Sequence, residues 1–70
     1  MTNSGEPINV SKAVLDGIKA VEKIGVDLHN PVQVKDMATK IGHHATARWI
    51  DKNMPEYMRG ALENGFKSSE

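Results

Sequence analysis

The histidines are the side chains in this sequence best suited to chemistry, because imidazole titrates near neutral pH and binds transition metals. His43 and His44 are adjacent, whereas His29 lies in a separate segment. Adjacent side chains on a helix diverge by about 100°, so His43 and His44 do not readily share one ion. The sequence has no cysteine to complete such a site. We therefore predict no metal site, and we expect both residues to lie partly exposed at a helix start.

Catalytic motifs are missing as well. The sequence contains no His-Glu-x-x-His pattern, no nucleophile elbow and no glycine-rich phosphate loop. A chain that barely closes one core also has little room for the pocket of ~300 Å³ or more that small-molecule sites usually need. These observations predict a protein that is not an enzyme and uses no cofactor.

Length and composition favour one small folded domain. A chain of 70 residues buries only about 60% of its unfolded surface, so its core needs good packing or a second chain. No apolar run approaches the roughly 18 residues of a membrane span, and the first residues lack the pattern of a secretory signal. We expect a soluble, intracellular (cytoplasmic) protein without membrane contact.

The charge distribution counts against nucleic acid as the partner. Nine Lys and Arg residues balance nine Asp and Glu residues, which gives no net charge. A nucleic-acid-binding domain is usually clearly basic, because phosphate contacts supply most of its non-specific affinity. Only the middle of the chain, residues 29–53, is mildly basic.

The apolar spacing predicts helices throughout. Val14, Ile18 and Val21 form one face of a first helix over about residues 11–24, and Gly25 is placed to end it. Gly17 lies inside this helix, either because a second helix approaches closely or because an exposed glycine is tolerated there.

A second helix has clear signals at both ends. Asn30 can cap its start, Pro31 suits the first helical position, and Gly42 is placed to end it. A third helix should cover about residues 44–53, with Ala45 and Trp49 facing inward and with Ile50 and Met54 as further candidates for that face.

The region around Pro55 allows two interpretations. The simpler is a separate fourth helix from Pro55, and the alternative is one bent helix over residues 44–64. Gly65 and Phe66 suggest a Schellman-type ending.

We find no strand signal. The sequence predicts an all-α fold, a small bundle of three to four short helices that dimerisation could complete. It should comprise a flexible lead-in over residues 1–8, one helical domain over 9–66 and a frayed tail over 67–70.

One stretch resembles part of a DNA-binding motif. Residues 34–42, Val-Lys-Asp-Met-Ala-Thr-Lys-Ile-Gly, resemble the first helix and turn of a helix-turn-helix. The second helix of that motif usually carries apolar residues six and nine positions after the glycine, where this chain has Arg48 and Asp51. The docking face is therefore out of phase unless the turn is shortened. The resemblance implies groove-facing and phosphate-contacting residues, namely Lys35, Lys40, Thr46, Arg48 and Lys52.

Association with another protein is the interpretation that the sequence favours. The first predicted helix has a wide apolar face, and methionine and aromatic side chains elsewhere are typical of interfaces. Self-association would also complete a small core. We expect a small helical protein-binding or regulatory module that forms a homo-oligomer, with DNA binding as the alternative. The candidate interface residues are Val14, Leu15, Ile18, Val21, Trp49, Tyr57 and Met58.

Overall fold

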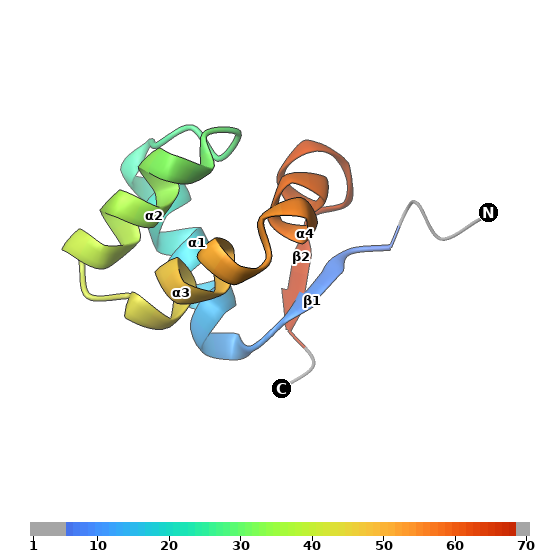
Figure 1. The fold of residues 1–70 in the computed structure, drawn as a ribbon, viewed down its shortest axis with the longest axis horizontal. Helices are drawn as coiled ribbons and strands as arrows, with labels where there is room; N and C mark the ends of the chain where they lie inside the picture. The colour runs from blue at the N-terminus through green and yellow to red at the C-terminus, as the bar shows by residue number, and fades with distance from the viewer. Residues whose placement is uncertain (1–5, 69–70) are drawn as a thin grey trace.

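Two short strands flank a run of helices in the structure, a computed structural model that describes residues 6–68 (Figure 1). The elements are, in order, β1 (Ile8–Val10), α1 (Lys12–Ile24), α2 (Pro31–Lys40), α3 (His44–Lys52), α4 (Met54–Arg59), the π-helical turn η1 (Gly60–Asn64) and β2 (Phe66–Ser68). The fold is mostly helical, which confirms the predicted small helical bundle.

Capping side chains set the ends of α1 as the sequence predicted. The Ser11 hydroxyl oxygen accepts a hydrogen bond from the Val14 backbone N–H at 3.3 Å. At the other end Gly25 has a φ of 105°, a left-handed conformation that side chains other than glycine rarely adopt. The predicted bounds of this helix are confirmed.

The predicted signals also determine α2 and the turn after it. The Asn30 side chain accepts a hydrogen bond from the Gln33 N–H at 3.3 Å, and Pro31 begins the helix. Gly42 has a φ of 91°, and the next residue, His43, donates its N–H to the Ala38 carbonyl at 2.7 Å. Only residues 41–43 separate α2 from α3.

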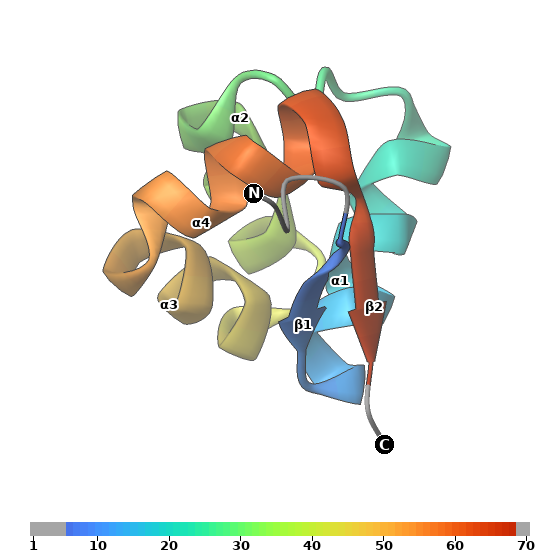
Figure 2. The same cartoon turned by 90° about the vertical axis from the view of Figure 1, so that its right-hand side faces the viewer.

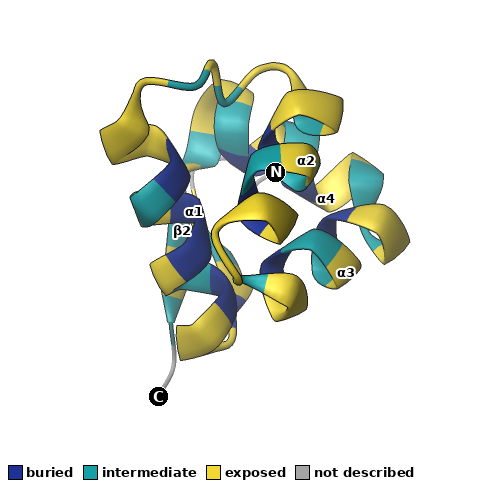
Figure 3. Ribbon diagram, turned by 90° about the vertical axis from the view of Figure 1, so that its left-hand side faces the viewer, coloured by how far each residue is buried: buried dark blue, intermediate teal, exposed yellow. Residues whose placement is uncertain are grey.

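The core corrects the predicted association surface. Most of that surface is internal: Val14 is 4% exposed, Ile18 2%, and Val21 and Tyr57 0%. The buried side of α1 faces the other helices of the same chain (Figure 3). These side chains are therefore covered by the chain itself. Leu15, Trp49 and Met58, the remaining members of the predicted surface, are half-buried.

A close contact between α1 and α3 explains Gly17. A Cβ added at Gly17 would lie 1.9 Å from the Thr46 hydroxyl oxygen. That hydroxyl donates toward the Val14 carbonyl at 3.1 Å and the Ala13 carbonyl at 3.3 Å. Thr46 is 0% exposed. The close-approach interpretation of Gly17 is confirmed.

The same contact corrects part of the predicted inward face of α3. Ile50 is buried, as the sequence allowed, and Trp49 and Met54 are half-buried. Ala45, expected to face inward, is exposed, whereas Thr46 is buried. The short turn and the contact with α1 rotate α3 by about one residue from the predicted phase. Thr46 also cannot serve as the groove-facing residue that the helix-turn-helix resemblance implied, because its side chain does not reach the surface.

A break at Asn53 separates α3 from α4. The Asn53 backbone leaves the helical conformation, with φ −130° and ψ 45°, and its side-chain amide donates to the Trp49 carbonyl at 3.0 Å. Pro55 then lies in the first turn of α4, where its missing N–H does no harm. The separate fourth helix is confirmed, and it starts one residue earlier than predicted.

The strands correct the prediction of an entirely helical chain. Ile8 pairs with Phe66 and Val10 with Ser68 in a parallel two-stranded sheet (Figure 2). The predicted lead-in over residues 1–8 therefore overlaps β1, and the predicted frayed tail over residues 67–70 overlaps β2. The rest of those two segments, residues 1–5 and 69–70, lies outside the described residues. Strands of three residues are too short to show a local alternating pattern.

Phe66 closes the core at the strand end. Its ring stacks on Tyr57 with 5.5 Å between ring centroids and meets the edge of Trp49 at 6.4 Å. A Cβ at Gly60 would lie 2.4 Å from the Phe66 ring, so this glycine gives the ring its space. Gly65 has a φ of 74°, but its ψ of −175° extends the chain into β2 instead of forming the predicted Schellman ending.

Replacement of Gly17 by alanine should lower the free energy of unfolding by about 1–3 kcal/mol, the usual cost of forcing extra atoms into a packed contact. Thermal and urea melts followed by circular dichroism measure the change. In a Thr46→Gly background the same replacement should cost less, because the two nearest atoms that the new Cβ meets, Thr46 Oγ1 and Cβ, are gone. A variant as stable as the unmodified protein would contradict this packing.

Candidate nucleic-acid interface

The outward face of α3 carries the most distinctive exposed side chains of the helical domain. This helix packs against α1 and α2, and the side opposite Thr46 and Ile50 is open to solvent. The exposed residues of α3 are His44, Ala45, Arg48, Asp51 and Lys52. Positions 44, 48 and 52 are four residues apart, so they lie along one stripe of the helix. Figure 3 shows α2 and α3 side by side, with exposed residues on their outer surfaces.

An open groove runs between α2 and α3 and has a volume of about 440 Å³. It is lined by Val32, Lys35, Asp36, Thr39, His44, Ala47, Arg48 and Asp51. Lys35 bridges the groove, with its Nζ 2.9 Å from Asp51 Oδ1. The two helices therefore present one surface on which charged side chains lie beside the apolar Val32 and Ala47.

The surface of α2 and α3 is more basic than the chain as a whole. Residues 29–53 contain four Lys and Arg residues against two Asp residues, an excess of two positive charges. The net charge of the whole sequence is zero because the acidic residues that balance this excess lie outside residues 29–53. A local excess of this kind attracts phosphate even when the whole protein is neutral.

Two of the five predicted DNA-contacting residues, Lys35 and Arg48, line the groove between α2 and α3. The Lys35 side chain is 32% exposed and pairs with Asp51, and Lys52 is exposed at the end of α3. Lys40 is exposed in the last turn of α2, where it lines a separate hollow beside Gly25–Asp27. Sequence reasoning placed Arg48 outward but missed that Thr46, four positions after Gly42, faces the core.

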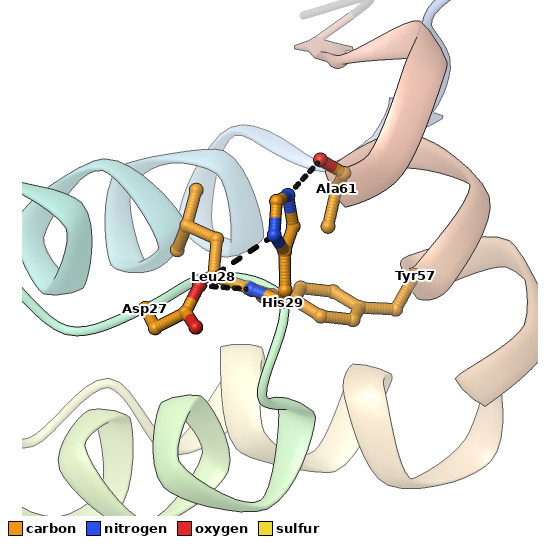
Figure 4. Close-up of polar contacts among 5 residues, drawn as sticks. All are labelled: Asp27, Leu28, His29, Tyr57 and Ala61. Carbon is orange, nitrogen blue, oxygen red and sulfur yellow. Dashed lines mark hydrogen bonds and ion pairs between the residues drawn. The ribbon is translucent and has the colours of Figure 1, made fainter.

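A second cluster of polar contacts joins the connector between α1 and α2 to α4 and η1 (Figure 4). The Tyr57 hydroxyl donates to the Leu28 carbonyl at 2.7 Å, and His29 Nε2 lies 3.2 Å from the Ala61 carbonyl oxygen. The His29 backbone N–H donates to the Asp27 carboxylate at 2.9 Å. Burial, with a smaller contribution from the Asp27 charge, raises the pKa of Tyr57 to about 12. Its hydroxyl therefore remains a donor across neutral pH, which is a structural role.

The histidines form no common site in the described part of the chain. His29 lies in the connector, His43 is half-buried beside Gly17, and His44 is exposed at the start of α3. No group of three or more His, Cys, Asp or Glu residues within residues 6–68 is arranged to hold a metal ion. Nor is any helix in that range both long and apolar enough to cross a membrane.

A second groove, of about 360 Å³, lies between α1 and η1. Its apolar residues include Leu15, Leu28, Leu62 and Phe66. Leu62 is 57% exposed, which is high for a leucine. Lys19, Glu22 and Glu63 add charges of both signs to the groove lining.

Comparison of the chain with protein-family models, with curated proteins and with solved structures finds no match in any of the three. The functional argument therefore rests on the geometry of these two grooves and the helices that line them.

Proposed function

We propose that this protein binds double-stranded DNA through α3. The observation that carries the proposal is the packing of α3, which buries Thr46 and Ile50 against α1 and α2 and leaves Arg48 and Lys52 in solvent. A helix held by one face, after a short glycine turn from a preceding helix, is the arrangement in which helix-turn-helix proteins present their recognition helix.

The dimensions of α3 fit the major groove. An α-helix with its side chains is about 10–12 Å in diameter, and the major groove is about 12 Å wide. The helix is joined to α2 by only three residues, so α2 necessarily lies close to whatever α3 contacts. This geometry supports contact of α3 with base edges and of α2 with the phosphate backbone.

Each exposed basic residue has a chemically suited role in such a complex. Arg48 is near the middle of α3, and a guanidinium at that place suits the O6 and N7 acceptors of guanine. Lys52, at the end of α3, and Lys40, at the end of α2, suit phosphate oxygens. The neutral total charge implies weak non-specific binding, so such a protein would depend on base contacts for its affinity.

Replacement of Arg48 and Lys52 by alanine should weaken binding to duplex DNA by tenfold or more at low salt. The slope of log affinity against log salt should fall by about 0.9, because Lys52 contacts phosphate whereas Arg48 contacts a base. Fluorescence anisotropy with a labelled duplex over a salt series measures both quantities. Both side chains are exposed, so the melting temperature should change little.

A matched control removes two positive charges from α1 and β2 instead. Lys23 and Lys67 are both exposed and lie outside both grooves, and Lys23→Ala with Lys67→Ala should leave the salt slope unchanged. Equal losses in the two double variants would contradict binding through α3. An absence of salt-dependent DNA binding by the unmodified protein would exclude the proposed function.

Self-association is a second candidate function, and the groove between α1 and η1 favours it. A two-fold interface places the same patch on both subunits, so it must be complementary to itself. This groove meets that requirement, because Lys19 of one copy can face Glu22 or Glu63 of the other around a shared apolar centre. The occupant proposed for this groove is therefore a second copy of the chain. The surface differs from the one predicted from sequence, of which it keeps Leu15 and Ile18.

Substitution of Leu62 by glutamate should shift the protein from dimer to monomer, because it places a charge in the apolar centre of this interface. Sedimentation velocity at micromolar concentration measures the change. Val32→Glu is the control, since Val32 is 65% exposed and lines the other groove. A monomeric unmodified protein at every concentration, or equal effects of the two variants, would contradict self-association at this groove.

A further inference from the structure

The ion pair between Lys35 and Asp51 lies within the proposed DNA-binding surface, and the following inference rests on that proposed function. Lys35 comes from α2 and Asp51 from α3, and their side chains meet at 2.9 Å across the groove. The Asp51 side chain is 67% exposed and the Lys35 side chain 32% exposed. Both groups are thus accessible to an approaching DNA backbone.

The ion pair between Lys35 and Asp51 contributes little to the stability of the fold. Exposed ion pairs contribute little to stability, because water screens the charges and two long side chains lose freedom. α2 and α3 also pack against each other and share a buried core, to which Ala38 and Ile50 belong. The ion pair therefore affects the binding of a charged ligand at the groove more than it affects the packing of the two helices.

A carboxylate at this position opposes DNA binding in two ways. Asp51 is on the exposed side of α3, so its negative charge repels the phosphates that flank the major groove. It also holds the Lys35 ammonium group, which would otherwise be available to a phosphate oxygen. For Lys35 to contact DNA it must leave Asp51, and the carboxylate then faces the DNA without its partner.

The other charged groups around the groove do not cancel this effect. Asp36 lines the groove together with Asp51, whereas Arg48 is the remaining permanently positive side chain in the lining. The groove lining therefore carries two carboxylates against Lys35 and Arg48. These four charges sum to zero, although the surrounding segment is basic.

We propose that Asp51 restrains non-specific DNA binding by sequestering Lys35 and by repelling the phosphate backbone. Productive binding then requires contacts that compensate for the carboxylate, as base edges in a matching site can provide. Asp51 is in this account a specificity-determining residue, since it weakens binding to every sequence that lacks those contacts.

The test is the Asp51→Asn variant with a random-sequence 20-base-pair duplex, measured by anisotropy over a salt series. The variant should bind several-fold more tightly than the unmodified protein, and its salt slope should rise by about 0.9, the value for one additional phosphate contact. Asp16→Asn is the control, because it removes one negative charge from the exposed side of α1, outside both grooves. It should change the affinity far less and leave the slope as it is.

A second comparison isolates Lys35. In a Lys35→Met background, Asp51→Asn should no longer raise the slope, because the released ammonium group is absent. If the unmodified protein binds the duplex and Asp51→Asn leaves affinity and slope unchanged, or matches Asp16→Asn, the inference is overturned while DNA binding stands. If neither the unmodified protein nor the variant binds the duplex at the lowest salt concentration, where non-specific binding is strongest, the proposed function itself is overturned.

Discussion

The contact between Gly17 and Thr46 is the constraint on which the arrangement of the helices depends. The absence of a side chain at Gly17 allows the Thr46 hydroxyl to reach backbone carbonyls of α1. A helix fixed at one residue has its rotation fixed as well, because its other positions follow at 100° intervals. Thr46 and Ile50 therefore point into the core, and the basic stripe of α3 points into solvent. The surface available for binding follows from one small residue on a neighbouring helix.

The end of the chain completes the core by different means. Phe66 follows η1 in the sequence. Its ring stacks on Tyr57, and its backbone begins the strand that pairs with β1. Tyr57 in turn holds the connector before α2 through its hydrogen bond to the Leu28 carbonyl. These contacts join segments that are distant in sequence. They show how a 70-residue chain without cysteine covers the apolar face of α1 with its own elements.

The sequence predicted what local signals determine and failed where distant contacts decide. The ends of α1 and α2 follow from capping residues and glycines such as Ser11, Gly25 and Asn30, and these were predicted. The phase of α3 depends on the contact with Gly17, which lies in another helix, so Thr46 was assigned to the surface and Ala45 to the core. The strands depend on a pairing between the two ends of the domain. At the candidate site, Arg48 and Lys52 were identified from the helix-turn-helix resemblance, and the structure leaves both exposed.

The central claim is that the outward face of α3 is the surface that meets duplex DNA. The most direct measurement is the mapping of backbone amide chemical shifts by NMR while an unlabelled duplex is added to the isotopically labelled protein. The account predicts that the largest shifts fall in α3 and in the facing residues of α2, while the residues that line the groove between α1 and η1 change little. Shifts centred on α1 and η1, or no shifts at all, would contradict it.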